Sequence, residues 1–515
     1  KERISMPNWL NDAVFYEIYP QSFYDSNGDG IGDINGITGK LDYIRSLGCN
    51  AVWINPCFDS PFRDAGYDVR DYKKVAPRYG TNDDLKRCFR EAHRRGMHVL
   101  LDLVPGHTSD QHPWFRESQK AERNAYSDRY IWTDTVWDRP NGFPSMSGAS
   151  ERDGCYLLNF FSSQPALNYG FNRTTASWQM RYTEPACVAT REAVKDVMRF
   201  WLDAGCDGFR VDMASSLVKN DEGHSATAAL WRNVRGMLDR EYPEAAMVSE
   251  WSMPFEAICK ARFHMDFYLN NVGNGYHSLF RKKVGGKDLS FFSREGDGDI
   301  MEFLDDYLPQ YRASRSSGYI SLITGNHDTH RMTENYGELE CKIADAFILM
   351  MPGVPFLYYG DEIGMRYLRL PSVEGGYDRT GSRTPMQWGH GKNLGFSTAE
   401  KAKLYLPIDP RAGAPTVEDQ EKKAGSLLNT IRKVLALRHR YPELQAKPNF
   451  EVVYAEKKKY PFVFRRGDFL IAVNPSANAV EIPLQEKGKP IFQIGESVLA
   501  GGRLAMHGQS FAVFR

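Results

Sequence analysis

Eight short apolar segments, alternating for the most part with stretches of helical spacing, constrain the fold of this chain more than any other feature. Continuous apolar strands that alternate with helices are typical of a parallel sheet covered on both faces. Eight such units are the number that closes a (β/α)8 barrel of the α/β class. An open doubly wound sheet is the rival, but no GxGxxG pattern follows the first segment. The eight segments are residues 14–23, 51–56, 98–104, 207–214, 245–251, 263–269, 319–328 and 354–362.

Two regions depart from this alternation. Residues 105–183 are rich in Ser, Asn, Pro and aromatic residues, which predicts a small domain inserted after strand 3. From about residue 430, β-branched and alternating runs separated by turns predict a C-terminal antiparallel β-sandwich. The expected division is therefore a barrel from 1–104 and 184–430, an inserted domain at 105–183 and a sandwich at 431–515.

Composition excludes several classes of partner. Lys plus Arg and Asp plus Glu both number 65 in 515 residues, and this zero net charge argues against a nucleic-acid partner. The most apolar run, 346–360, contains two prolines and is too short to span a bilayer, so no membrane partner is expected. Eight scattered cysteines without a CxxC pair argue against a zinc ribbon and favour a reducing, cytoplasmic compartment.

Ionisable residues stand where the barrel strands end. In a barrel of this kind the active site lies at the carboxyl ends of the strands. Arg210 and Asp212 end the fourth segment, two residues apart and so on one face, Glu250 ends the fifth and Asp328 the seventh. Three carboxylates at the mouth of one barrel repel one another, and this repulsion costs stability. Their placement there is therefore better explained by a function than by folding.

A pair of carboxylates is the machinery of glycoside hydrolysis. One must stay ionised to attack the anomeric carbon, and Asp212 suits this role because Arg210 favours its charge. The other must hold a proton, and Glu250, followed by Trp251, suits a carboxyl whose pKa is raised by an apolar wall. Asp328 is then expected to hold sugar hydroxyls and to stabilise positive charge in the transition state.

Ordered motifs over about 380 residues resemble the α-amylase family, glycoside hydrolase family 13, and most of all its oligo-1,6-glucosidase, α-glucosidase and trehalose synthase branch. They are FYEIYPQSFYDSNGDGIGDINGI, GYDVRDY, LVPGHTSDQHPWF, QPALNYGF, DGFRVDMA, VSEW, TGNHDTHR and SRTPMQW. The resemblance implies that Asp212 is the nucleophile, Glu250 the general acid/base and Asp328 the transition-state stabiliser.

The resemblance also implies a set of substrate-binding residues. Arg210, His107 and His327 would line the subsite of the transferred glucose, and Asp64 and Tyr67 would hold that glucose at its non-reducing end. An arginine near SRTPMQW, either Arg379 or Arg383, is expected to pair with Asp64. Phe161 and Gln164 would close over the substrate from the inserted domain.

The stretch DSNGDGIGD, residues 25–33, begins like a calcium loop. An EF-hand needs a bidentate Glu at position twelve, which here is Gly36, and the flanks are predicted to be a strand and a helix. The family resemblance instead implies one structural cation, Ca²⁺ or alternatively Mg²⁺. Its ligands would be Asp25, Asn27, Asp29, the Ile31 carbonyl and Asp33.

Three positions depart from the family pattern. Gly106 stands where an Asn is common and predicts no second calcium site, and Ala166 stands where an Asp is usual. Met213, after the expected nucleophile, matches neither the Val of α-1,6-cleaving relatives nor the Ala or Thr of α-1,4-cleaving ones. The preferred linkage therefore stays open.

The sequence thus favours a retaining, exo-acting α-glucosidase that hydrolyses short α-glucosides such as maltose, isomaltose or sucrose. The alternative is a glucosyl transferase or isomerase of the same family, of the trehalose synthase or isomaltulose synthase type. A non-catalytic relative of the transporter heavy chains is disfavoured, because all three carboxylates remain. No organic cofactor is expected, and the chain is expected to be a monomer or a small homo-oligomer.

Overall fold

A computed structural model describes residues 6–140 and 142–515. At its centre eight parallel strands follow the eight predicted segments, in the order β13-β10-β9-β8-β5-β2-β1-β14. A parallel bridge between Ile323 and Phe356 closes the sheet into a barrel, which confirms the predicted (β/α)8 architecture. The strands are β1 (Phe15–Ile18), β2 (Ala51–Ile54), β5 (His98–Leu103), β8 (Gly208–Val211), β9 (Ala246–Ser249), β10 (Met265–Phe267), β13 (Tyr319–Ser321) and β14 (Phe356–Tyr358).

The strands are shorter than their apolar segments because local signals end them early. β1 stops at Ile18, since Pro20 occupies the first turn of a short helix, α1 (Pro20–Phe23), where a proline fits without losing a hydrogen bond. The residues of each apolar segment that lie beyond the end of its strand form the loops that carry the ionisable groups.

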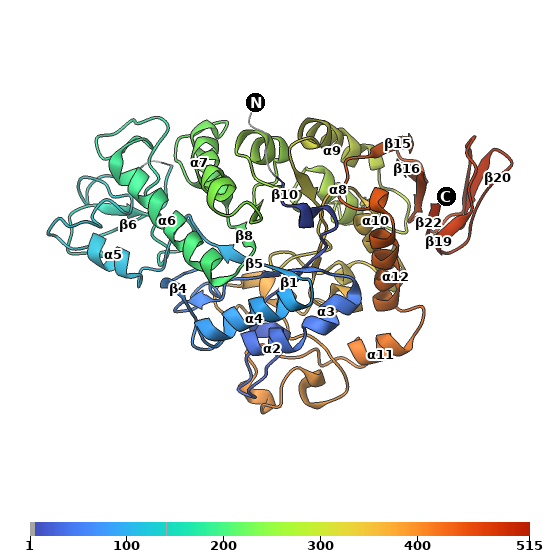
Figure 1. Ribbon diagram of the computed structural model, residues 1–515, viewed down its shortest axis with the longest axis horizontal. Helices are drawn as coiled ribbons and strands as arrows, with labels where there is room; N and C mark the ends of the chain where they lie inside the picture. The colour runs from blue at the N-terminus through green and yellow to red at the C-terminus, as the bar shows by residue number, and fades with distance from the viewer. Residues whose placement is uncertain (1–5, 141) are drawn as a thin grey trace.

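Helices surround the barrel (Figure 1). In α4 the apolar residues Leu85, Phe89 and Ala92 recur at helical spacing and are buried, and a capping box between Thr81 and Asp84 starts the helix. Between β1 and β2, two helices, α2 and α3, meet at Lys40. The helices are α2 (Ile34–Gly39), α3 (Leu41–Leu47), α4 (Asn82–Arg94), α6 (Pro185–Ala204), α7 (Ser225–Glu241), α8 (Gly275–Phe280), α9 (Ile300–Ser314), α10 (Glu338–Met350), α11 (Val417–Lys422) and α12 (Leu427–Arg440).

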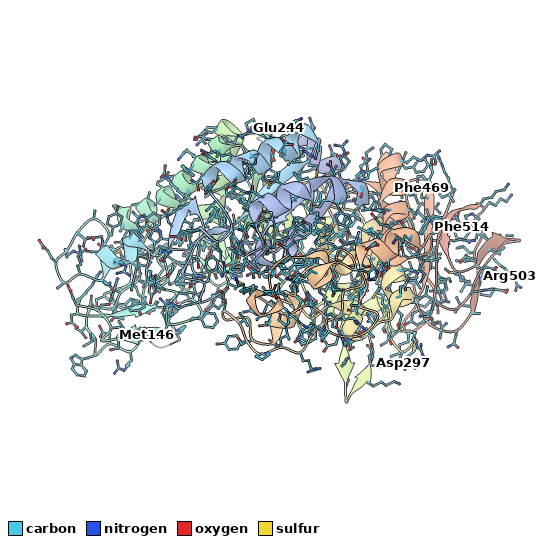
Figure 2. The ribbon with its side chains drawn as sticks, turned by 90° about the horizontal axis from the view of Figure 1, so that it is seen from below. Met146, Glu244, Asp297, Phe469, Arg503 and Phe514 are labelled. Carbon is cyan, nitrogen blue, oxygen red and sulfur yellow. The ribbon has the colours of Figure 1, made fainter. Side chains whose placement is uncertain are left out.

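The region after β5 has little regular structure, as expected for an insertion. It contains α5 (Pro113–Ser118) and a hairpin of β6 (Ser145–Ser147) with β7 (Cys155–Leu157). A small apolar cluster of its own includes Ile131, Leu157 and Phe171. It lies at one end of the molecule, where Figure 2 labels Met146.

The C-terminal strands form two antiparallel sheets at the opposite end, near Phe514 and Arg503 in Figure 2, which confirms the predicted sandwich. One sheet has the order β15-β16-β17-β22-β19 and the other β18-β21-β20. The expected boundary at residue 430 falls inside α12, and the domain boundaries stay a prediction. The strands are β15 (Phe450–Tyr454), β16 (Phe462–Arg466), β17 (Phe469–Asn474), β18 (Val480–Pro483), β19 (Pro490–Ile494), β20 (Ser497–Ala500), β21 (Arg503–Met506) and β22 (Ser510–Phe514).

Two further hairpins flank the barrel: β3 (Phe58–Asp59) with β4 (Asp71–Val75), and β11 (Lys283–Val284) with β12 (Lys287–Asp288). Within the part of the chain that the structure describes, no helix combines the length and the apolar character needed to cross a membrane.

Candidate active site

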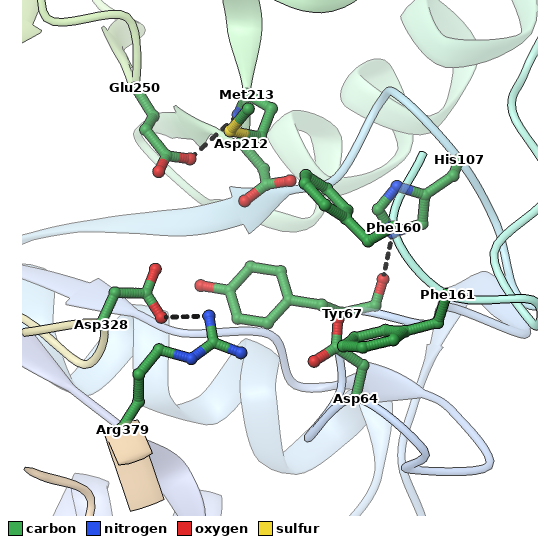
Figure 3. Close-up of a pocket in the computed structure, with 10 residues that line it drawn as sticks. All are labelled: Asp64, Tyr67, His107, Phe160, Phe161, Asp212, Met213, Glu250, Asp328 and Arg379. Atoms are coloured by element: carbon green, nitrogen blue, oxygen red, sulfur yellow. Dashed lines mark hydrogen bonds and ion pairs between the residues drawn. The ribbon is translucent and has the colours of Figure 1, made fainter. Parts of the chain in front are cut away.

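A pocket opens at the carboxyl ends of the barrel strands (Figure 3). Eight of its ten lining residues were predicted from the sequence, and the other two are Phe160 and Met213. The predicted Gln164, Arg210, His327 and Arg383 do not line the cavity but support residues that do. The lining residues are Asp64, Tyr67, His107, Phe160, Phe161, Asp212, Met213, Glu250, Asp328 and Arg379.

One guanidinium joins the two carboxylates of the expected reaction. Arg210 Nη1 donates to Asp212 Oδ1 over 3.0 Å, and Arg210 Nη2 donates to Glu250 Oε2 over 2.7 Å. The Met213 N–H donates to the same Glu250 oxygen over 3.0 Å. Met213 has a φ of 42°, an unusual backbone for a side chain of its size, and such strain is frequent at functional sites.

Both carboxyls titrate near neutral pH, so Arg210 does not keep the pKa of Asp212 low as the sequence suggested. Burial raises the pKa of Asp212 to about 7 and that of Glu250 to about 8, and Arg210 opposes the rise in both. Near neutral pH one carboxyl of the pair can therefore be ionised while the other holds its proton.

Asp328 carries the most firmly held negative charge of the site. Arg379 Nη1 and Arg383 Nη2 donate to its Oδ1 over 2.9 and 3.0 Å. Burial alone would raise the pKa of Asp328, but Arg383 and Arg379 reverse this and hold the pKa well below its usual range. Asp328 therefore stays ionised under all working conditions.

The expected ion pair between Asp64 and an arginine is wrong. Both Arg379 and Arg383 bind Asp328 instead, because the turn that carries them (Tyr377–Ser382 and the residue after it) packs against the loop beyond β13. Arg379 lines the pocket, whereas Arg383 is buried behind it.

Asp64 is held from the inserted region. Gln164 Nε2 donates to Asp64 Oδ2 over 2.7 Å, and the Gln164 Oε1 accepts the Phe161 N–H over 3.1 Å. Burial raises the pKa of Asp64 to about 7. The Phe161 ring stacks on Tyr377 at a centroid distance of 6.0 Å. Gln164 and Phe161 thus join the inserted region to the barrel mouth.

Both predicted histidines contact Tyr67 and are buried. The backbone oxygen of Tyr67 lies 2.9 Å from His107 Nε2, and its hydroxyl lies 2.6 Å from His327 Nε2. Burial lowers the pKa of His107 to about 4 and that of His327 well below its usual range, so both rings are neutral near pH 7.

Sequence reasoning missed two residues of the site. Phe160 projects into the pocket beside Phe161, and the FF doublet was the available signal (Figure 3). Asp102, within β5, accepts hydrogen bonds from Arg210 and from the Trp53 indole, over 2.9 and 3.1 Å. A carboxylate in the middle of the apolar run HVLLDLV was a signal for it.

The loop at residues 25–33 supplies only oxygen ligands, which fits a hard cation. Gly30 has the position and the positive φ of 99° that the sharp turn of a calcium loop needs. The Asp25 carboxylate accepts the N–H groups of Gly28 and Gly30, and Asp33 accepts those of Ser26 and Gly36. Among residues 6–140 and 142–515, no three acidic, His or Cys side chains gather closely enough to hold a metal. Amide and backbone oxygens would therefore have to complete such a site.

Comparison with known proteins decides the family. Residues 17–447 match the family model of the α-amylase catalytic domain. The chain belongs to the α-amylase family, glycoside hydrolase family 13. The predicted family is confirmed, and so is the prediction that the chain is an enzyme of glycoside hydrolase type.

Two curated relatives cover most of this family 13 chain. A trehalose synthase/amylase of Mycolicibacterium smegmatis is 36% identical over 84% of this chain and 77% of its own length. An oligo-1,6-glucosidase of Heyndrickxia coagulans is 31% identical over 92% of this chain and 93% of its own length. Among solved structures, an isomaltulose synthase mutant from Erwinia rhapontici NX5, in complex with its natural substrate sucrose, has a TM-score of 0.82. It is 26% identical and covers 99% of both chains.

Proposed function

We propose that this family 13 enzyme is a retaining, exo-acting α-glucosidase of short α-glucosides. The observation that carries the proposal is the shared contact of Asp212 and Glu250 with the Arg210 guanidinium, over 3.0 and 2.7 Å. Two carboxyls held by one guanidinium favour the close spacing of a retaining enzyme, about 5–5.5 Å, over the wider gap that an inverting enzyme leaves for water.

In the first step an Asp212 oxygen attacks the anomeric carbon while the bond to the leaving oxygen breaks. Glu250 gives its proton to that oxygen, and the result is a β-glucosyl ester on Asp212. In the second step Glu250 takes a proton from water, whose oxygen attacks the same carbon and frees Asp212. Asp328, held ionised by two arginines, stabilises the positive charge that develops on the sugar in both steps.

The far end of the pocket supports exo action on small substrates. Asp64 is buried and accepts a hydrogen bond from Gln164, and the Phe161 ring stacks on Tyr377. A closed end of this kind suits the terminal glucose of a disaccharide or short oligosaccharide, whereas a long polymer needs an open cleft. The preferred linkage among maltose, isomaltose and sucrose stays open.

The second candidate is glucosyl transfer or isomerisation on the same machinery. It is favoured by the 36% identity to a trehalose synthase/amylase and by the likeness in fold to an isomaltulose synthase. Only the acceptor differs, because a sugar hydroxyl takes the place of water in the second step.

Product analysis over time tests the two candidates. The chain is incubated with each of maltose, isomaltose, sucrose and trehalose, and free glucose and new disaccharides are quantified by chromatography. Hydrolysis predicts that free glucose accounts for nearly all products at early times. A new disaccharide that forms faster than glucose would establish transfer or isomerisation instead. Loss of all turnover in Asp212→Asn is the control.

We further propose that the loop at residues 25–33 binds one structural Ca²⁺, with Mg²⁺ as the alternative, through Asp25, Asn27, Asp29, the Ile31 carbonyl and Asp33. The all-oxygen ligands and the turn at Gly30 support this. We also propose a cytoplasmic location, supported by eight free cysteines, seven of which are buried.

A further inference from the structure

A buried glutamate lies directly behind the catalytic pocket and has no part in the mechanism above. Glu17 is on β1 and is fully buried. It pairs in register with Trp53 of the next strand, so both side chains point to the same face of the sheet. Its Oε1 lies 2.7 Å from His327 Nδ1, and its Oε2 is buried without a hydrogen-bond partner.

Two contacts of His327 Nδ1, with Asn55 and with Glu17, bear on which ring nitrogen of His327 carries the hydrogen. Asn55 Nδ2 lies 3.2 Å from the same Nδ1, and an amide nitrogen can only donate. With the Asn55 amide in this orientation, in which its Oδ1 has no hydrogen-bond partner, His327 Nδ1 is an acceptor without a hydrogen of its own. The short contact with Glu17 then needs a hydrogen from the carboxyl, so Glu17 is protonated.

The rest of the surroundings agrees with a neutral Glu17. An ionised carboxylate with one oxygen unpartnered would be costly at full burial. Burial is the largest influence and raises the pKa of Glu17 well above its usual range. Arg210 on β8 and a hydrogen bond from Asn55 oppose this rise, whereas Asp328 beyond β13 and Asp102 on β5 add to it. Tyr358 on β14 faces Glu17 as well, and burial raises its pKa well above the usual range, so it is neutral.

A neutral imidazole that accepts at Nδ1 carries its hydrogen on Nε2. That N–H faces the Tyr67 hydroxyl at 2.6 Å and Asp328 Oδ2 at 3.4 Å. The Tyr67 hydroxyl is then free to donate to Asp102 Oδ2, 3.2 Å away. Each hydrogen in this series of hydrogen bonds, from Glu17 through His327 and Tyr67 to Asp102, then faces an acceptor. Asp328 faces the N–H of His327 rather than a nitrogen lone pair.

We propose that Glu17 is a positioning residue that keeps its proton, donates it in a hydrogen bond to His327 Nδ1, and so fixes the tautomer with N–H at Nε2. The expected effect of Glu17 on turnover rests on the proposed α-glucosidase function, whereas the tautomer of His327 does not depend on that function.

The direct test is long-range ¹H–¹⁵N NMR on the full chain labelled with ¹⁵N-histidine. The His327 signals are assigned as those lost in His327→Gln. The expected result is a neutral ring with N–H at Nε2, unchanged from about pH 6 to about pH 8 because neither partner titrates there. A hydrogen on Nδ1, or a doubly protonated ring, would mean that Glu17 is an ionised acceptor and would overturn the proposal.

Two substitutions test the effect on catalysis. Glu17→Gln keeps a neutral donor, so kcat/KM is expected within about threefold of the parent, with both limbs of its pH profile in place. Glu17→Leu leaves Nδ1 without this donor, and kcat/KM is expected to fall roughly tenfold or more, consistent with the cost of an unsatisfied buried group. Equal losses in the two variants, or a pH limb that shifts in Glu17→Gln, would contradict the proposal.

Glu362 provides a matched control. It is another fully buried carboxyl with one unpartnered oxygen, but it bonds to Tyr16 and Tyr43 rather than to the histidine. Glu362→Gln is expected to leave the His327 signals unchanged. If the chain turns over none of the α-glucosides, the proposed function fails and the NMR result still decides the tautomer.

Discussion

Asp212 and Glu250 share an arginine, and the raised pKa values of the pair make a prediction for pH. The free enzyme must have Asp212 ionised and Glu250 protonated. The pKa values of about 7 and about 8 therefore predict that kcat/KM rises as the pH passes about 7 and falls as it passes about 8. The two limbs belong to the coupled pair. A pH–rate profile with a flat plateau from acid to alkaline pH would contradict the assignment.

Substitution of the acid/base should affect substrates unequally. Glu250→Gln is expected to lower kcat/KM on maltose by about 10²–10⁴-fold, because the leaving oxygen loses its proton donor. An aryl α-glucoside whose leaving group needs no proton should lose much less in its first step, and the alkaline limb should vanish. Equal losses on both substrates would show that Glu250 is not the proton donor.

Residues at strand ends were predictable from the sequence, whereas partners across the site were not. Asp212, Glu250 and Asp328 each follow an apolar run that ends at the barrel mouth. The partner of Arg379 depends on how the turn after β14 packs against the loop after β13, and no local pattern encodes that packing. Glu17 was missed for a related reason, since its role depends on His327, 310 residues away along the chain.

At the scale of the element, the loop between α1 and α2 carries the proposed cation. Ca²⁺ is expected to raise the melting temperature of the chain and a chelator to lower it, because the ion binds the folded loop and not the unfolded chain. Calorimetry measures both. Asp25→Asn should abolish this dependence, while Asp83→Asn, an exposed aspartate on α4, should preserve it. A melting temperature that does not change on addition of Ca²⁺, Mg²⁺ or a chelator would contradict the proposed site.

Element types were easier to predict than element ends. The alternation of apolar and helical segments predicted all eight barrel strands, because burial on both faces demands continuous apolar runs. It did not predict that β13 ends at Ser321, because the apolar residues that follow it belong to the loop that carries His327 and Asp328.

At the scale of the whole molecule, a buried arginine joins the sandwich to the barrel. Arg466, on β16, is fully buried and donates to the backbone oxygens of Met350, at the end of α10, and of Glu443. Arg466→Leu leaves these carbonyls without a donor and is expected to cost about 3 kcal/mol or more of folding stability. Its neighbour Arg465 is partly exposed, so Arg465→Leu should cost less than about 1 kcal/mol. Thermal unfolding measures both, and equal shifts would contradict the account.

The most direct test of the whole account is a proton NMR time course of hydrolysis that follows the anomers of released glucose. The parent chain is compared with Asp212→Asn on maltose, isomaltose, sucrose and trehalose. A retaining enzyme with Asp212 as nucleophile predicts α-glucose from the non-reducing end before mutarotation, and at least about a thousandfold loss of rate in Asp212→Asn. Early β-glucose would contradict the retaining mechanism, and activity that survives in Asp212→Asn would contradict Asp212 as the nucleophile.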